Sequence, residues 1–438
     1  MFNFVEIRRN ERMSDQNLLK NIKQKLKSLW SIPIFKYAII VHILYFVLST
    51  ILTLVFFRTQ NDFLVYYQAG ENALNDFMAL YTPVEDTWPF RYFPLAAFYF
   101  IPFYLLGFDL GFIVFNFINL ILNIIISVYL YKVIKLIRRE DHEDNDDRII
   151  VYICIFLLSL PQLFNYFLGQ INLYITFFTI FSLYLFLKTE QIKMQFLASL
   201  ILGISGIFKP ITIFMVPFLI LSYYSYKEKR FKFELKRTIV RSVGILLPLA
   251  INGIVFVLYP KLWQDFTAIN ITGEANTLIN YSFSITKLGT NFLFFMGVPA
   301  NLLIQYQLYI FIPILFIIGG IGFFILIFRR DPRNTVIYGY TLGILVMLLT
   351  YFDSWNHHLL ILTPLLTIIL FVLPRNSEIS GKYIKPSILF FSFFDIIFMG
   401  IFLLTQTFFP FNFASTIFLI LSFYGIIRNL MKSRNNNE

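Results

Sequence analysis

Charged residues are scarce in this chain, and their scarcity excludes the largest class of proteins. Only 14% of the 438 residues are Asp, Glu, Lys or Arg, whereas a soluble globular domain carries roughly 25%. Hydrophobic residues make up 58%, and they recur in runs of about 17–25 residues, the length that spans a bilayer as a helix. The sequence therefore predicts an all-α polytopic membrane protein.

Cysteine and phosphate-binding motifs are also nearly missing. The single cysteine, Cys154, lies inside an apolar run, so neither an intramolecular disulfide nor a cysteine-based metal site can form. There is no glycine-rich phosphate loop and no strand–helix alternation of the nucleotide-binding kind. The net charge of +11 does not indicate nucleic acid, because the basic residues follow the loops between apolar runs.

The apolar runs define about twelve spans within one membrane domain over residues 37–430. A basic segment, 1–36, precedes this domain, and a short tail, 431–438, follows it. The first run is too long for a signal peptide and lacks a cleavage site, so we expect an uncleaved anchor. The spans are 37–57, 110–135, 149–168, 172–187, 195–208, 211–226, 239–259, 306–328, 336–351, 358–374, 386–405 and 413–430.

The distribution of Lys and Arg sets the orientation. With twelve spans, both termini are cytoplasmic, and only Arg58, Arg91, Lys209, Lys261 and Lys287 of the 36 basic residues lie outside. The remaining 31 (36 minus 5) lie inside, as the positive-inside rule requires. We therefore expect a multi-pass protein of the plasma membrane, or of the endoplasmic reticulum membrane if the host is eukaryotic.

Two outer regions are long, 58–109 and 260–305. The first begins with apolar residues at three-to-four spacing after Asp62, which predicts an amphipathic interfacial helix. Residues 92–107 are apolar but short and contain Pro94 and Pro102. Counting them as a span would place the basic loops outside, so we interpret them as a re-entrant segment packed against protein.

Polar residues gather at five places on the predicted outer face, where they are expensive unless paired or in contact with a polar cavity. The five places are Asp62, Arg91-Tyr92, Gly169-Gln170-Ile171-Asn172, Lys209-Pro210 and Asp353-Ser354-Trp355-Asn356-His357-His358.

Each place also has a purely structural interpretation. Asp62 could cap the interfacial helix, Lys209 could be a snorkelling side chain at a helix end, and Arg91 could anchor at the headgroups. Gln170 and Asn172 could satisfy a tight turn, and the two histidines could be interfacial side chains beside Trp355. His42 and Asp395, within the first and eleventh spans, are expected to be buried structural partners.

Together, an acid, a lysine and histidines at an outer membrane edge suit one kind of chemistry. A sugar carried on a polyprenyl phosphate needs an apolar groove for the isoprenoid and a cation for the leaving phosphate. It also needs a carboxylate to take the acceptor proton. The helices would supply the groove, Lys209 and Arg91 the cation, and Asp62 the base.

Several motifs in this order resemble the GT-C superfamily of membrane glycosyltransferases, and within it glycosyltransferase family 87. The second proline of the family's aromatic-Pro-Pro is absent, since Leu95 follows Pro94. The matching elements are Asp62 with Tyr66-Tyr67-Gln68-Ala69-Gly70, Leu80-Tyr81, Phe90-Arg91-Tyr92-Phe93-Pro94-Leu95, Gly169-Gln170-Ile171-Asn172, Gly203 through Lys209-Pro210, and Trp355-Asn356-His357-His358.

This resemblance implies a GT-C fold and an inverting transfer of a hexose, mannose above all, from a polyprenyl-phosphate carrier. The acceptor would be a lipid-linked or glycan hydroxyl, with no cofactor and no metal required. Asp62 would be the general base, and Lys209, Arg91 and His358 would bind the donor phosphate. The substrate pocket would be lined by Tyr66, Tyr92, Gln170, Asn172, Trp355 and His357.

Two other classes of protein share some of these features. A lipid flippase would place its polar residues near mid-bilayer in two related halves, whereas here they gather at one face. A polymerase or ligase of prenyl-diphosphate-linked polysaccharides also works at the outer face, but usually with arginine-rich outer loops.

Overall fold

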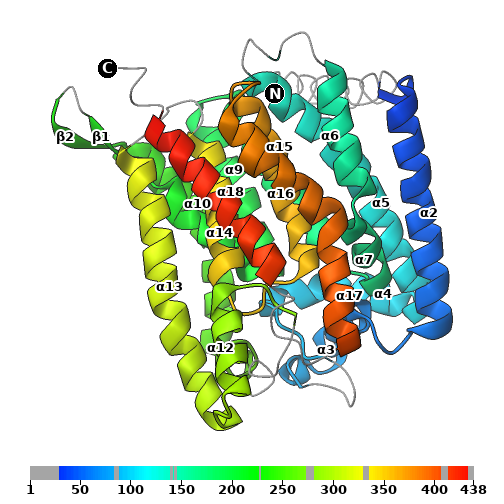
Figure 1. Cartoon of the computed structure of the whole chain (residues 1–438). Helices are drawn as coiled ribbons and strands as arrows, with labels where there is room; N and C mark the ends of the chain where they lie inside the picture. The colour runs from blue at the N-terminus through cyan, green and yellow to red at the C-terminus, as the bar shows by residue number, and fades with distance from the viewer. Residues whose placement is uncertain are drawn as a thin grey trace, which may run out of the picture.

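The computed structural model describes residues 29–82, 88–138, 142, 146–225, 228–272, 281–328, 335–405 and 413–432. Most of the predicted amino-terminal segment and most of the predicted tail lie outside these residues. The longer helices run roughly side by side as one bundle (Figure 1).

The first half of the chain alternates long helices with short ones. Its helices are α2 (Pro33–Phe56), α3 (Asp62–Asn75), η1 (Phe77–Ala79), η2 (Pro94–Phe100), α4 (Ile101–Leu105), α5 (Phe108–Ile137), α6 (Asp146–Leu158), α7 (Leu160–Leu168), α8 (Asn172–Lys188), α9 (Ile192–Phe208) and η4 (Pro210–Leu219).

A β-hairpin opens the second half. Its elements are β1 (Ser222–Ser225), β2 (Arg230–Phe233), α10 (Leu235–Leu258), α11 (Pro260–Thr267), η5 (Ala268–Thr272), α12 (Ile285–Phe295), α13 (Ala300–Phe328), α14 (Thr335–Thr350), η7 (Asn356–His358), α15 (Leu359–Val372), η8 (Ser380–Ile384), α16 (Lys385–Leu389), η9 (Phe390–Phe394), α17 (Asp395–Thr405) and α18 (Phe413–Lys432).

Within the described part of the chain, seven helical stretches are long and apolar enough to cross a membrane. Outer helices such as α2 and α13 expose most of their apolar surface, with Phe316 of α13 74% accessible. Such a surface is stable only against lipid. The prediction of an all-α polytopic membrane protein is therefore confirmed. Every predicted span coincides at least in part with a helical segment, but the count of twelve remains a prediction.

The centre of the bundle consists of α14 and α15. Every residue of both helices is buried, so each is apolar on all sides and enclosed by other helices. The loop that joins them, residues 351–358, is consequently fixed at both ends by the best-packed part of the molecule.

One predicted span, 211–226, is wrong as an α-helix. The structure has a 3₁₀ helix, η4, that ends at Leu219, and residues 222–225 form the strand β1. Pro217 lies inside η4 and cannot donate to an α-helical ladder. Tyr223 and Tyr224 pair instead with Lys232 and Phe231 across an antiparallel hairpin.

The segment 92–107 is helical but short, as the sequence predicted. Seven 3₁₀ residues of η2 and five α-helical residues of α4 extend about 21 Å at 2.0 and 1.5 Å per residue, less than the roughly 30 Å of a bilayer core. It begins beside the end of α9, where the Phe93 amide donates to Ile207 O (3.3 Å). It packs along α3, where Gly70 approaches the Phe100 carbonyl. These contacts support a segment that does not cross.

The two long regions predicted to lie outside, 58–109 and 260–305, are largely helical in their described parts. The predicted interfacial helix is α3, which buries Phe63, Tyr66 and Ala69 against the segment after it. The region 260–305 contains α11, η5 and α12, and α13 begins at residue 300. Residues 273–280 of this region lie outside the described ones.

Candidate active site

Asp62 is the first residue of α3 and does not cap it. The cap is Asn61, whose side-chain oxygen accepts from the Leu64 amide (3.0 Å) and whose Nδ2 donates to Phe57 O (2.9 Å). The capping interpretation of Asp62 is therefore wrong. The Asp62 carboxylate is half-buried and accepts a short hydrogen bond from Nε2 of Gln170.

A glycine turn brings Gln170 to this position. Gly169 ends α7 in the left-handed conformation (φ 64°), which glycine adopts at little cost. A Cβ at Gly169 would also lie 2.6 Å from Cβ of Phe63. The turn thus needs glycine both for its backbone and for its close approach to the start of α3.

Side-chain amides link Asp62 to Lys209. Oε1 of Gln170 accepts from the hydroxyl of Tyr66 (3.2 Å) and from Nδ2 of Asn172 (3.4 Å). Oδ1 of Asn172 then accepts from Nζ of Lys209 (2.8 Å). Gln170 and Asn172 therefore do more than satisfy a turn, since they join the acid to the buried lysine.

Two tyrosines form a wall beside Gln170. The hydroxyls of Tyr66 and Tyr92 are 2.9 Å apart, and the Tyr66 ring stacks on Phe100 (4.8 Å between centroids). Tyr81 donates to the carbonyl of Tyr92 (2.7 Å). Phe100 of η2 thus holds the ring of Tyr66, and Tyr81 holds the backbone at Tyr92.

Arg91 is paired with an acid from the loop between the two central helices. Its Nη1 lies 2.7 Å from Oδ2 of Asp353, and both side chains are about one-fifth accessible (21% and 23%). The other oxygen of Asp353 accepts from the indole nitrogen of Trp355. Arg91 is therefore more than a headgroup anchor, because a carboxylate from the 351–358 loop orients it.

The two histidines lie in the turn η7, directly before α15. Nδ1 of His358 accepts from the Trp355 amide (3.2 Å), so the proton of the neutral ring belongs on Nε2. Nε2 is buried and has no hydrogen-bond partner. The ring of His357 packs edge-on against that of His358 (4.5 Å). His358 thus presents a buried donor that an anion could satisfy.

Burial and charge shift several pKa values at this site. Burial raises the pKa of Asp62, although the hydrogen bond from Gln170 and the charge of Lys209 oppose the shift. Burial lowers the pKa of Lys209 to about 7 against the opposing effect of Asp62 and Asp353. Burial and the nearby Lys209 lower the pKa of His357 well below its usual range.

Sequence reasoning missed the role of Lys287, which had only been counted among the outer cations. Lys287 is fully buried in the first turn of α12, and Asp353 and Arg91 are its charged neighbours. The Phe283 amide donates to Ser354 O (3.1 Å), and the Ser354 amide donates to Oγ of Ser282 (2.9 Å). These bonds hold the start of α12 against the loop that carries Asp353.

The intramembrane polar residues are structural partners, as expected. Nε2 of His42 lies 2.7 Å from the Tyr166 hydroxyl and 2.8 Å from Nδ2 of Asn123, and Nδ1 lies 3.0 Å from Leu157 O. Asp395 accepts hydrogen bonds from Tyr281 and Ser415. His42 thus joins α2 to α5, α6 and α7, and Asp395 joins α17 to α18 and to the segment before α12.

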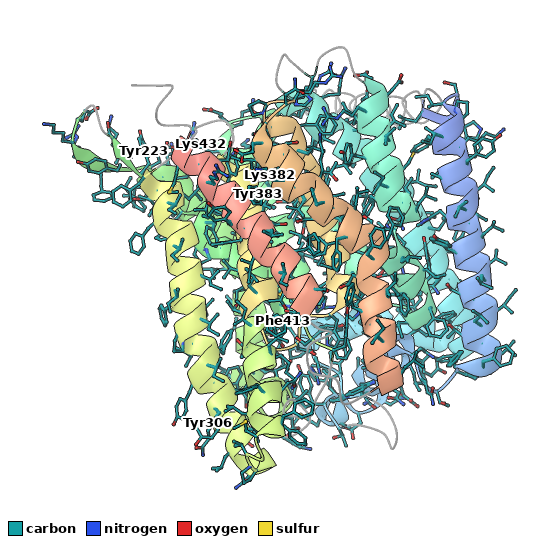
Figure 2. All side chains as sticks on the ribbon, viewed as in Figure 1. Tyr223, Tyr306, Lys382, Tyr383, Phe413 and Lys432 are labelled. Atoms are coloured by element: carbon teal, nitrogen blue, oxygen red, sulfur yellow. The ribbon has the colours of Figure 1, made fainter. Side chains whose placement is uncertain are left out.

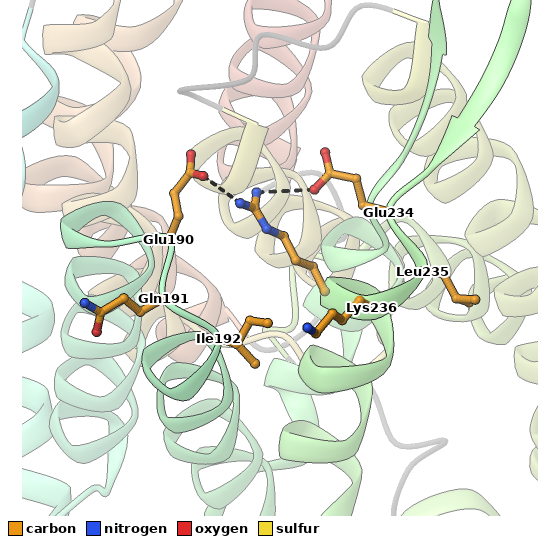
Figure 3. Close-up of a pocket in the computed structure, with 7 residues that line it drawn as sticks. Glu190, Gln191, Ile192, Glu234, Leu235 and Lys236 are labelled. Atoms are coloured by element: carbon orange, nitrogen blue, oxygen red, sulfur yellow. Dashed lines mark hydrogen bonds and ion pairs between the residues drawn. The ribbon is translucent and has the colours of Figure 1, made fainter.

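A separate pocket lies at the other end of α9, between its first residue and the start of α10 (Figure 3). Arg237 bridges Glu190 (2.6 Å) and Glu234 (3.3 Å) there. The pocket is a helix length away from Lys209, and both of its acids are paired with Arg237. It is therefore distinct from the candidate site.

The structure thus brings the predicted site residues together where α3, α8, α9 and α15 meet. This is a multi-pass membrane protein with an acid, buried cations and tyrosines at one end of its bundle. The chain belongs to glycosyltransferase family 87, whose sequence profile matches residues 90–351. No curated protein matches it.

Proposed function

We propose that this glycosyltransferase transfers a hexose, with mannose the first candidate, from a polyprenyl-phosphate carrier to a lipid-linked or glycan acceptor at the outer membrane face. Membership of family 87 favours transfer over lipid transport. One observation carries the proposal. The carboxylate of Asp62 does not cap a helix, and hydrogen bonds through Gln170 and Asn172 link it to the buried ammonium of Lys209.

In the proposed step, Asp62 takes the proton of the acceptor hydroxyl as its oxygen attacks the anomeric carbon. The bond from that carbon to the carrier oxygen breaks, and its electron pair stays on the phosphate. A raised pKa makes Asp62 a better proton acceptor than an exposed carboxylate. Attack from the face opposite the leaving phosphate inverts the anomeric configuration.

The leaving group gains one negative charge in this step, from a phosphodiester to a phosphate monoester. Lys209 and Arg91 supply positive charge, and Nε2 of His358 supplies a neutral donor that lacks a protein partner. Groups fixed in advance where charge develops stabilise the transition state most. We expect no cofactor, because these side chains can balance the phosphate charge.

The remaining residues would shape the sugar pocket. Tyr66 and Tyr92 present hydroxyls next to Gln170. Trp355 and His357 belong to the 351–358 loop, and their rings are parallel. Asn172 orients the ammonium of Lys209. The exposed apolar helices would hold the isoprenoid.

A detergent assay with labelled polyprenyl-phosphate sugars tests the function. The purified protein should consume the donor and label an added acceptor without any closed membrane, because transfer needs no second compartment. A transporter would move the lipid between leaflets of a vesicle and leave it chemically intact. Intact donor under all acceptor conditions, together with vesicle transport, would overturn the proposal.

A further inference from the structure

The hairpin β1–β2 is the one described segment with β-structure, and it lies at the end of the bundle opposite Asp62. It is followed directly by α10, whose 24 residues extend about 36 Å at 1.5 Å per residue. The hairpin projects beyond the upper end of α13 (Figure 1). It therefore extends over the lipid that would surround the bundle at that end.

One face of the hairpin is aromatic. Directly opposite residues share a face, and the register pairs Tyr224 with Phe231 and Ser222 with Phe233. The rings of Tyr224 and Phe231 lie 5.6 and 5.7 Å from that of Phe328, at the end of α13. Phe231 and Phe233 nevertheless stay 59% and 52% accessible. The aromatic face therefore continues the lipid-facing surface of α13.

The other face and the turn are basic. Arg230 and Lys232 lie opposite Ser225 and Tyr223, and Lys229 is exposed in the turn. Arg230 and Lys232 share one acid, Glu228. Within the described residues 228–233, three cations and one carboxylate leave an excess of two positive charges.

We propose that this hairpin is a membrane-surface anchor that binds anionic phospholipid headgroups of the leaflet at its end of the bundle. Its aromatic face lies at the acyl boundary, and its basic face contacts the headgroups. Aromatic rings at the headgroup level and basic residues above them are the combination that favours this depth.

The depth is tested by bromolipid quenching. The single native cysteine is first replaced in the full-length protein (Cys154→Ala). A new cysteine is then introduced either on the aromatic face (Phe231→Cys) or on the opposite face (Ser225→Cys), and an environment-sensitive fluorophore is attached to it. Lipids brominated on the acyl chain should quench the label at 231 strongly and that at 225 weakly. Equal quenching at both positions would overturn the proposed orientation.

The headgroup preference is tested by titrating detergent-solubilised protein with phosphatidylglycerol or phosphatidylcholine and following thermal stability. The double variant Arg230→Gln/Lys232→Gln should need at least tenfold more phosphatidylglycerol for the same rise in Tm. Its matched control is Lys382→Gln/Lys432→Gln, because these lysines also share one acid, Glu378. They lie at the same end of the bundle (Figure 2).

The control variant should titrate like the wild type, and phosphatidylcholine should distinguish none of the three proteins. If the hairpin variant titrates like the wild type, or the control loses as much, the hairpin is not the anionic-lipid site. Neither experiment measures sugar transfer, so the result stands apart from the proposed function.

Discussion

At the scale of single residues, the different hydrogen-bond partners of the neighbours Asn61 and Asp62 say most about the role of Asp62. Asn61 holds the start of α3 through the Leu64 amide, while the carboxylate of Asp62 points to Gln170. The sequence left both roles open for Asp62, because Asn and Asp cap helices about equally well. The two roles of Asp62 are distinguished only by the position of Gln170 in the folded protein.

The pH dependence of donor use should report two of these residues. kcat/KM reports groups of the free enzyme, so it should rise with pH as Asp62 loses its proton, at a pKa above its ordinary value. It should fall again above about pH 7 as Lys209 loses the charge that binds phosphate. Arginine stays protonated, so Lys209→Arg should remove the alkaline fall. If the pH profiles of the wild type and Lys209→Arg fall identically at alkaline pH, Lys209 does not bind the phosphate.

Lys287 and Asp353 should be coupled energetically. Lys287→Met removes a buried cation beside Asp353 and should lower the free energy of unfolding by about 1–3 kcal/mol. The double variant with Asp353→Asn should lose less than the sum of the two single variants, because the attraction between Lys287 and Asp353 can be lost only once. Thermal or denaturant unfolding of all four proteins gives this coupling, expected at roughly 0.5–3 kcal/mol. Strict additivity would show that the two residues act separately.

At the scale of elements, apolar runs predicted the long helices, because a membrane-spanning segment has to satisfy its own backbone, but they did not predict the short helices α11 and α12. They also failed at residues 222–225, where a strand follows η4. The composition of that stretch is compatible with an apolar helix and with a half-exposed aromatic strand. The strand depends on pairing with Arg230–Phe233, and the hydrophobic pattern does not predict that contact.

The turn at Gly169 offers a test at this scale. Gly169→Ala places a side chain at positive φ and against Phe63, which should cost about 1–3 kcal/mol and move Gln170 from Asp62. Both thermal stability and turnover should fall. Gly253→Ala in α10 is the matched control, since its Cβ would meet nothing within 4 Å and alanine favours a helix. Equal effects of the two variants would refute the role of the turn.

At the scale of the whole molecule, the candidate site and the basic hairpin lie at opposite ends of one bundle. The sequence predicted this separation from the Lys and Arg distribution alone. It could not predict that Asp353 forms an ion pair with Arg91 and is also a charged neighbour of Lys287, about two hundred residues further along the chain than Arg91. That juxtaposition depends on how α12 packs against the loop after α14.

Cysteine accessibility tests the orientation. In the Cys154→Ala background, Thr59→Cys should react with a membrane-impermeant maleimide added to intact cells, whereas Lys229→Cys should react only after permeabilisation. Both positions are exposed on the protein surface. Labelling of residue 229 in intact cells would invert the topology and place the candidate site in the cytoplasm.

The central claim is that Asp62 is the catalytic base, and the transfer rate of Asp62→Asn tests it most directly. Loss of a general base typically costs about 10²–10⁴-fold in rate, and asparagine keeps the size of the side chain. Asn61→Ala is the control, because it should cost about 1 kcal/mol of stability while transfer continues at near the wild-type rate. We predict that folded Asp62→Asn loses at least a hundredfold in turnover of polyprenyl-phosphate sugar. Turnover close to that of the wild type would contradict the account.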